Sequence, residues 1–418
     1  MPFYLGLDFG TSGARAIAID SSRHIAAEAQ YPFNSNATEE RTVTWKTALF
    51  DLLDRLPFPV RRETEAIAIN GTSSTVLLCD RDGTPVEPPL LYNDGRGGSL
   101  MAQMRAIAPA NHPVLSASSS FAKLLWWRQN SQQNPSDRSF LHQADWLAYQ
   151  LHGQLGISDY HNALKLGYDA NNLCYPDWLR ELSDIPTLPR VVTPGDTIGS
   201  VTPEIARRFE FPRDCRVCGG TTDSIAAFIA SGANSPGEAV TSLGSTLVLK
   251  LLSRDRVDDP NYGIYSHRFG DLWLPGGASN TGGAVLKQFF TDEELDTLSR
   301  QIPDTESPLD YYPLVRPGER FPIHDPHLPP KLDPKPADPV EFLHGLLESI
   351  ARIEAQGYRR LQELGATSLA KVYTAGGGAK NPTWTAIRER HLNVPVTKSA
   401  CAEAAYGTAL LALRGMAD

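Results

Sequence analysis

The chain has 418 residues, and 41% of them are hydrophobic, which is enough for two sizeable cores and therefore for two domains. Its net charge of −9 argues against general nucleic-acid binding, because neutralising phosphates requires a basic surface. No apolar run approaches the roughly 20 residues that cross a bilayer, so we expect no membrane association.

The start of the chain and its cysteines bear on where the protein works. Strand-like residues begin at position 3, so we expect no removable leader. The five cysteines are irregularly spaced, which favours a reducing compartment over a disulfide framework. We therefore expect a cytoplasmic protein, or one of the plastid stroma if a plant transit peptide is absent from this sequence.

The first half of the chain alternates short apolar runs with turn residues. The predicted strands lie at residues 3–7, 14–19, 24–32, 66–69, 75–79 and 216–220. Helices are expected over 42–56 and 224–231, and residues 97–154 look mainly helical. The opening order of three strands, a helix and a strand differs from the strand–helix alternation of an all-parallel sheet.

The second half begins after a turn-rich segment at 232–237, which predicts domains of 1–232 and 233–418. A strand, turn and strand over 239–250 resemble residues 4–19, which indicates a weak internal repeat. The remaining predictions are an extended loop at 303–340, a helix at 339–364, a strand at 372–374, and helices from 381 and at 402–414.

The turn from Asp8 to Gly13 has the composition of a phosphate-binding hairpin. Gly10 and Gly13 let backbone N–H groups approach an anion closely, and Thr11 and Ser12 add hydroxyl donors. Asp8, at the end of a strand, could hold a hydrated Mg²⁺ beside the phosphates. The alternative is an ordinary hairpin turn, for which Gly and Asp are also common.

Three further features bear on a nucleotide site. Arg15 could neutralise phosphate charge or only anchor the hairpin. A second hairpin, Leu243-Gly244-Ser245-Thr246, would allow a triphosphate to be held by one hairpin from each half. The glycine run 376–378 leads from a strand into a helix, which places N–H groups and a helix dipole near a nucleotide. Neither a Walker-type loop nor a Gly-x-Gly-x-x-Gly after a first strand is present.

Four segments in this order resemble the FGGY family of carbohydrate kinases, a branch of the actin-like ATPases. They are Gly6-Leu7-Asp8-Phe9-Gly10-Thr11-Ser12, Gly220-Thr221-Thr222-Asp223-Ser224, Ser242-Leu243-Gly244-Ser245-Thr246 and Ala375-Gly376-Gly377-Gly378-Ala379-Lys380-Asn381. Within the family, the chain is most similar to a plant and cyanobacterial group of D-ribulose kinases once labelled xylulose kinase-like. Residues 8–16, 71–73, 160–168 and 219–228 carry that closer match.

The resemblance implies an α/β fold with two actin-like, ribonuclease H-like domains, each a mixed sheet flanked by helices, and an interdomain cleft. It implies a sugar domain carrying the first hairpin, followed by an ATP domain. The implied activity is ATP- and Mg²⁺-dependent phosphorylation of the terminal hydroxyl of a ketopentose, D-ribulose giving D-ribulose 5-phosphate. Sugar and ATP would be the partners of a monomer or homodimer.

The resemblance also assigns roles to residues. Asp223 would be the general base that accepts the proton of the sugar hydroxyl; the alternative is a plain helix N-cap. Asp8 would serve Mg²⁺ and the sugar, and Ser73 and Thr72 the sugar. The ATP-binding set would be Thr11, Ser12, Gly13, Arg15, Gly244, Ser245, Thr246, Gly282, Gly376, Gly377, Asn381 and Trp384.

Two segments leave the substrate open. Ser73-Ser74 stands where bacterial xylulose kinases have Met-His, which favours a ketopentose other than xylulose. Asp94 lies in Tyr92-Asn93-Asp94-Gly95-Arg96, which resembles a common family motif but equally fits a turn. D-xylulose, L-ribulose, glycerol or another ketose or polyol remain alternatives. An actin-like ATPase with a binding or regulatory role would share the hairpins but lack the segments at 71–73 and 220–223.

Overall fold

The computed structural model describes residues 1–34, 40–131 and 137–416. The chain forms two compact units, Met1–Ala230 together with Glu403–Asp418, and Ser231–Ala402. The predicted boundary after residue 232 lies two residues from the end of the first stretch of the first unit, and the structure packs Glu403–Asp418 with that unit and not with residues 231–402. Within the described ranges, no helix combines the length and apolarity needed to cross a membrane.

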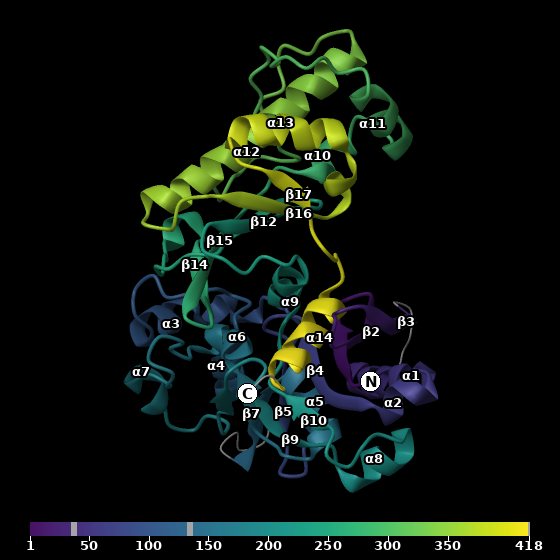
Figure 1. The fold of residues 1–418 in the computed structure, drawn as a ribbon. Helices are drawn as coiled ribbons and strands as arrows, with labels where there is room; N and C mark the ends of the chain where they lie inside the picture. Colours follow the sequence, from purple (N-terminus) through teal and green to yellow (C-terminus); the bar gives the residue numbers. More distant parts are fainter. Residues whose placement is uncertain (35–39, 132–136, 417–418) are drawn as a thin grey trace. The chain divides into compact units, whose positions relative to one another are not determined.

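The first unit is built on a seven-stranded sheet (Figure 1). β1 is central, antiparallel to β2 and parallel to β4. The order β3-β2-β1-β4-β10-β9, with β11 also on β4, uses strands Phe3–Phe9 (β1), Gly13–Asp20 (β2), Ile25–Pro32 (β3), Thr64–Gly71 (β4), Thr197–Ser200 (β9), Arg216–Cys218 (β10) and Thr221–Thr222 (β11). The carboxyl ends of the parallel strands therefore gather at one edge.

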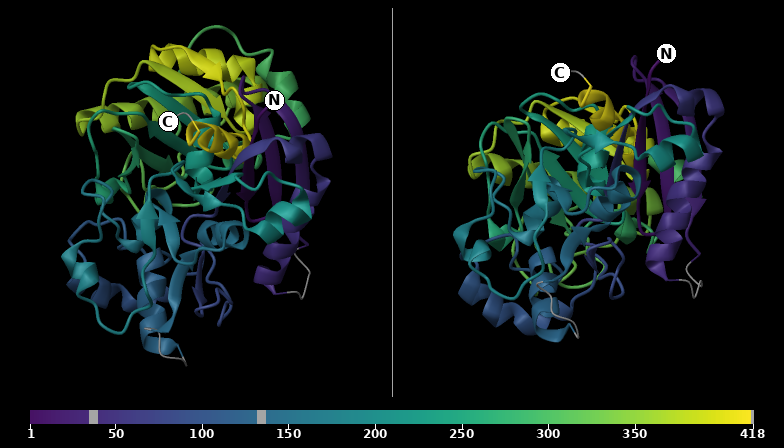
Figure 2. Two further views of the ribbon diagram at one scale, coloured as in Figure 1. Left: turned by 60° about the horizontal axis from the view of Figure 1, so that its bottom comes forward. Right: turned by 90° about the horizontal axis from the view of Figure 1, so that it is seen from below.

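Apolar side chains cover both faces of this sheet. On one face, strand residues such as Leu5 and Leu7 pack with α1 (Arg41–Arg55), α5 (Gln143–His152) and α8 (Pro203–Phe209). On the other face, residues such as Tyr4 and Ile17 pack with α14 (Ala404–Arg414). Figures 1 and 2 show this last helix, in yellow, beside the purple strands of the first unit.

Specific contacts explain why α14 joins the first unit. A Cβ on Gly6 would lie 2.1 Å from the carbonyl oxygen of Ala405, so only glycine allows this close approach. Asn70 donates from Nδ2 to Thr408 Oγ1 at 2.6 Å. Arg15 on β2 forms an ion pair with Glu403, just before the helix. These contacts between distant parts of the sequence are not visible in local patterns.

A smaller subdomain of the first unit lies between β4 and β10 in the sequence. Its own apolar core includes Phe121, Trp127 and Phe140. Its elements are β5 (Val76–Cys79), α3 (Met101–Ile107), α4 (Ser120–Asn130), β6 (Ser139–His142), β7 (Ile157–Asp159), α6 (Tyr160–Ala163), α7 (Asp177–Arg180) and β8 (Arg190–Val192). The short helix α2 (Phe58–Arg62) precedes β4 and packs through Val60 on the core of the main sheet. The expectation of a mainly helical 97–154 missed β6, which pairs with β5.

The second unit repeats the strand order of the first over five strands. Its sheet runs β14-β15-β13-β12-β16-β17, in which β12 is antiparallel to β13 and parallel to β16, as β1 is to β2 and β4. The strands are Glu238–Leu243 (β12), Leu247–Leu251 (β13), Tyr265–Phe269 (β14), Leu272–Ser279 (β15), Lys371–Ala375 (β16) and Val396–Lys398 (β17). The predicted internal repeat is therefore confirmed, with one strand added.

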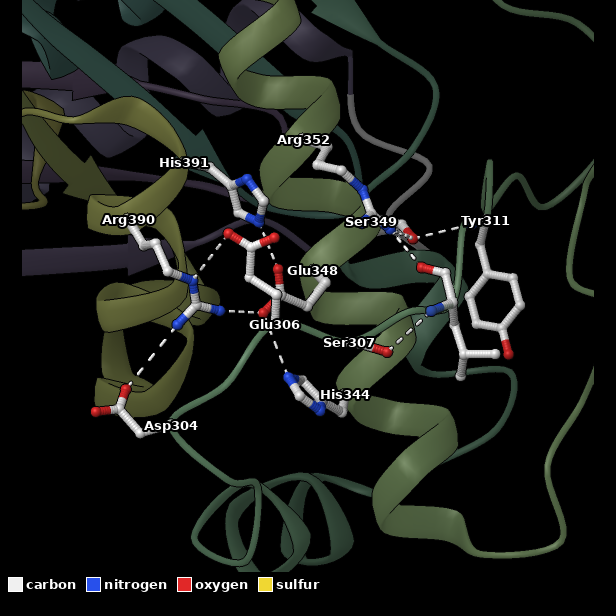
Figure 3. Close-up of polar contacts among 11 residues, drawn as sticks. Asp304, Glu306, Ser307, Tyr311, His344, Glu348, Ser349, Arg352, Arg390 and His391 are labelled. Carbon is white, nitrogen blue, oxygen red and sulfur yellow. Dashed lines mark hydrogen bonds and ion pairs between the residues drawn. The ribbon is translucent and has the colours of Figure 1, made fainter.

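Two helices, α12 (Pro339–Glu363) and α13 (Pro382–Leu392), pack with each other and with the strands of the second sheet. Buried Arg388 on α13 donates to Glu354 on α12 from Nε at 2.6 Å and from Nη2 at 2.7 Å. Figure 3 shows a second cluster, in which the buried carboxylate of Glu348 meets Arg390 and His391 of α13. Charged contacts thus fix α13, whose first turn borders the cavity described below.

In the Glu348 cluster, basic side chains compensate the charge of the buried carboxylate. Burial disfavours the ionised carboxylate, but the His391 hydrogen bond and the charge of Arg390 outweigh burial and hold the pKa of Glu348 below its usual range. His344, one turn earlier on α12, approaches the same carboxylate at 3.3 Å. The arrangement stabilises the helix pair as an ion-paired core.

Candidate active site

The first hairpin joins β1 to β2 as predicted. Gly10 donates its N–H to the carbonyl of Gly13 at 3.0 Å, and Thr11 and Ser12 are exposed at the tip. A Cβ on Gly13 would lie 2.7 Å from the carbonyl oxygen of Tyr31, so the neighbouring strand β3 requires glycine there. The tip therefore presents two free hydroxyl side chains on a rigid strand pair.

Polar residues gather where β1, β4 and β11 end. Asp8 is opposite Asn70 in the register of β1 and β4, and Thr221 is opposite Asn70 in that of β4 and β11. Asp8 Oδ1, Asn70 Oδ1 and Thr222 Oγ1 are buried and lack a hydrogen-bond partner within the described ranges. Buried polar atoms normally have partners, so these oxygens indicate a place where a ligand or ion belongs.

The two candidate catalytic carboxylates interact at this edge. Burial, and after it the negative charge of Asp223, raise the pKa of Asp8 to about 6, while Arg15 and Asn70 oppose the rise. Like charges disfavour ionisation in this way only when they are close together. Asp8 and Asp223 therefore face the same region of the first unit.

Asp223 is the first residue of α9 (Asp223–Ala230). Its Oδ1 accepts the N–H of Ser224 at 2.7 Å, a contact that resembles capping. The preceding Thr222, which could have capped the helix, leaves its hydroxyl unpartnered. The first turn of α9 thus holds the Asp223 carboxylate in place, and the negative charge of that carboxylate raises the pKa of Asp8.

The turn at 72–75 carries Thr72 and Ser73, the two hydroxyls predicted to contact a sugar, and they lie in different surroundings. Thr72 Oγ1 is buried and bound to Thr75 Oγ1 at 2.6 Å and to Gln143 Oε1 at 3.0 Å. Ser73 is partly exposed. This geometry gives Thr72 a structural task and leaves Ser73 as the hydroxyl of this turn that can reach a ligand.

The second hairpin borders a cavity of about 530 Å³ in the second unit. Gly244, Ser245, Gly377, Asn381 and Trp384 line it, all from the predicted ATP-binding set. Further lining residues, not predicted, include Leu243, Leu286, Lys287, Leu295, Asp296 and Lys380. An apolar wall with a few charged groups fits a nucleoside phosphate.

Three predicted residues of the second unit, Thr246, Gly282 and Gly376, are not among the residues that line the cavity, and Asn381 has a structural task besides lining it. Gly282 lies against the hairpin, because a Cβ there would be 2.8 Å from Thr246 Cα. Asn381 accepts from the N–H of Trp384 at 3.0 Å and donates to Ser299 Oγ at 2.8 Å. Both ends of its amide are occupied, so Asn381 acts as the cap of α13 in this structure.

Arg15 pairs with a carboxylate of the protein, so its charge is already compensated without a phosphate. Its guanidinium is paired with Glu403, so the structure favours the alternative in which Arg15 anchors the hairpin. It still acts on the site at a distance, since its charge opposes the rise in the Asp8 pKa.

Two glycines provide a test of the cavity. Gly376 has a φ of 85° and a Cβ there would lie 2.6 Å from the carbonyl oxygen of Leu243, whereas a Cβ on Gly98 in the first unit would meet only Ala117 Cβ, at 3.8 Å. We expect Gly376→Ala to displace the second hairpin and raise the Kd for ATP by about tenfold or more, which is about 1.4 kcal/mol. Gly98→Ala, the control outside the cavity, should change it less than threefold. Isothermal titration calorimetry measures both, and equal affinities would contradict the role given to Gly376.

Both halves of the chain match models of one protein family. Residues 3–230 match the N-terminal domain model of the FGGY family of carbohydrate kinases, and residues 239–416 match its C-terminal domain model. The chain belongs to the FGGY carbohydrate kinase family. As a member of this family it is a carbohydrate kinase, for which ATP is the expected phosphoryl donor.

Individual FGGY relatives have low sequence identity to this chain, but the matches cover nearly the full length of both proteins. A xylulose kinase of Staphylococcus xylosus is 22% identical, over 99% of this chain and 91% of the relative. The crystal structure of xylulose kinase from Rhodospirillum rubrum matches with a TM-score of 0.86 and 23% identity, over 100% of this chain and 90% of that one. Plasmodium falciparum glycerol kinase with ADP matches with a TM-score of 0.85 and 17% identity, over 99% and 89%. These likenesses confirm the predicted α/β fold with two sheet-containing domains.

Several residues of this candidate site were not predicted from the sequence. Asn70 and Thr222 contribute buried oxygens beside Asp8, and Gln143 holds Thr72. Gln143 begins Gln143-Ala144-Asp145-Trp146-Leu147, a segment similar to the family, so a signal for it existed. Leu286 and Leu295 of the cavity carry no motif and could be found only in the structure.

Proposed function

We propose that the protein is a ketopentose kinase that phosphorylates D-ribulose at its terminal C5 hydroxyl with ATP. The observation that carries this proposal is the pair of carboxylates Asp8 and Asp223, whose charges interact at the sheet edge, with the partly exposed Ser73 in the turn after β4. The cavity of the second unit supports nucleotide binding, with the size and apolar wall that a nucleoside needs.

In the proposed reaction, Asp223 accepts the proton of the sugar hydroxyl as its oxygen attacks the γ-phosphorus. The new O5–P bond forms while the bond from the γ-phosphorus to the β–γ bridging oxygen breaks, which gives ADP and the sugar phosphate. Ionised Asp8 and the hydroxyl of Ser73 would orient the sugar. Positioning and charge stabilisation supply most of the rate enhancement in phosphoryl transfer.

The oxygen-rich edge fits a magnesium ion. The unpartnered atoms of Asp8, Asn70 and Thr222 are carboxylate, amide and hydroxyl oxygens, the hard ligands that Mg²⁺ prefers. No group of three His, Cys, Asp or Glu side chains in the described parts of the chain could hold an ion alone. Asp8 would therefore hold Mg²⁺ through water, and the bound ion would neutralise charge on the phosphates.

Two observations bear on the sugar. D-ribulose and D-xylulose differ only in the configuration at C3, so the side chains around that hydroxyl decide between them. Ser73-Ser74 places small hydroxyl side chains in the turn and no imidazole, which favours a ketopentose other than D-xylulose, and D-ribulose is the one that the resemblance implies. The relatives are named xylulose kinases, which makes D-xylulose the second candidate.

A substrate panel tests the proposal. ADP release is measured with D-ribulose, D-xylulose, L-ribulose and glycerol, and NMR locates the phosphate on the product. We expect the highest kcat/KM with D-ribulose and the phosphate at C5. A higher kcat/KM for D-xylulose would replace the proposed sugar. Absence of stimulation by every sugar would favour an actin-like ATPase with a binding or regulatory role.

A further inference from the structure

Lys123 on α4 is a buried lysine that the reaction does not use. Its side chain is fully buried, and Nζ donates hydrogen bonds to the carbonyl oxygens of Ser74 and Leu91, each at 2.6 Å. Burying an amine carries a desolvation penalty that an apolar side chain of the same length would avoid. Its place in the core therefore points to a task that depends on its N–H donors.

The two acceptors belong to two different loops beside the candidate sugar site. Ser74 is in the 72–75 turn, which presents the hydroxyl of Ser73, and Leu91 precedes the loop that contains Asp94. The Asp94 loop is itself braced by Arg96, which donates from Nε to Asp94 Oδ1 at 2.9 Å. A single amine thus connects both loops to one helix.

The 72–75 turn needs such a connection because its backbone is strained. Ser74 has a φ of 64°, a left-handed conformation that residues other than glycine seldom adopt. Strained residues of this kind persist when their surroundings fix them, and they concentrate at functional sites. Gln143 holds the turn through Thr72, and Lys123 holds it through Ser74.

The two hydrogen bonds do not depend on the charge of the amine. Burial lowers the pKa of Lys123 to about 7; Asp94 opposes this change, while Lys165 and Arg96 add to it. A neutral amine keeps two N–H donors, the number of carbonyl oxygens that it meets. The connection can therefore persist on both sides of neutral pH.

We propose that Lys123 is a positioning residue that fixes the 72–75 turn and the Asp94 loop, and so sets where the Ser73 hydroxyl meets the sugar. Lys123 does not contact the substrate in this account. The inference rests on the proposed function, because it assigns the 72–75 turn to the sugar subsite.

Steady-state kinetics test the inference with three variants. Lys123→Met keeps the length but no donor, Lys123→Gln keeps two donors on a shorter chain, and Lys46→Met removes an exposed lysine from α1 as the control. We expect Lys123→Met to raise the KM for D-ribulose about tenfold or more, and Lys123→Gln to raise it less. The KM for ATP should stay unchanged and kcat within about threefold. Lys46→Met should match the parent.

The other possible results contradict either the inference about Lys123 or the proposed function. A folded Lys123→Met protein with the parental sugar KM overturns the inference, and so do sugar and ATP KM values that rise by the same factor. If Lys123→Met does not fold, Lys123→Gln decides by the same criteria. A parent that turns over no sugar in the panel removes the proposed function and the inference together, whereas parental turnover with unaffected variants removes the inference alone.

Discussion

Asp223→Asn is expected to lower kcat for sugar phosphorylation by about 10²–10⁴-fold, the range typical of a lost general base. The amide is nearly isosteric with the carboxylate but cannot accept the hydroxyl proton. The Kd for ATP should change less than threefold, because the cavity assigned to the nucleotide lies in the second unit. Coupled ADP-release assays and calorimetry measure the two quantities.

The control for this variant is Asp214→Asn, which removes an exposed carboxylate from the same unit. It should keep parental kcat and ATP affinity. Asp223→Asn should also lower the pKa of Asp8, since the charge of Asp223 contributes to raising it. Substantial ribulose turnover by Asp223→Asn would return Asp223 to the alternative role of a helix cap.

Asp8→Asn is expected to abolish sugar phosphorylation and any Mg²⁺-dependent background ATP hydrolysis. In the proposed mechanism, the ionised form of Asp8 would orient the sugar and hold the hydrated ion. Because the pKa of Asp8 is about 6, kcat/KM should fall as pH decreases through 6. A pH profile that is flat between pH 5 and 8, or Mg²⁺-dependent ATP hydrolysis that persists in the variant, would contradict this role.

The same substitution should stabilise the ligand-free protein at high pH. The folded-state pKa of Asp8 is raised from 3.8 to about 6, so its contribution to stability is fully present below pH 3.8 and is lost as pH rises through 6. Asn carries no charge to desolvate, and we expect it to raise the free energy of unfolding at pH 8 on the order of 2 kcal/mol. Urea denaturation at pH 4 and pH 8 measures this difference. A destabilised variant at pH 8 would indicate general damage instead.

Local sequence patterns predicted the elements on which the proposed chemistry depends. The hairpin after Asp8 and its counterpart at Gly244 form where expected, because turn residues between apolar strands determine them locally. The helix over 339–364 is observed as Pro339–Glu363, since its apolar period is long and regular. Asp8 was predicted at the end of a strand and Asp223 at the start of a helix, and β1 and β11, which lead to them, both pair with β4 in one sheet.

Local sequence patterns could not show which residues from distant parts of the sequence contact each other. A hydroxyl in a motif looks the same whether it faces a ligand, as Ser73 can, or a neighbouring amide, as Thr72 does with Gln143. The sequence left two roles open for Arg15, and only its pairing with Glu403 distinguishes them. Lys123 gave no sign of its role, because its acceptors are backbone carbonyls.

The return of α14 to the first unit makes that unit discontinuous in the sequence, with consequences for biosynthesis and for protein engineering. During translation, the sheet face formed by residues such as Tyr4, Ile17 and Ala66 stays without its covering helix until α14 has left the ribosome. A fragment that ends at Ala230 would expose that apolar face. Dissecting the enzyme therefore requires a circular permutation or a linker that joins α14 directly to α9, because one cut cannot release an intact half.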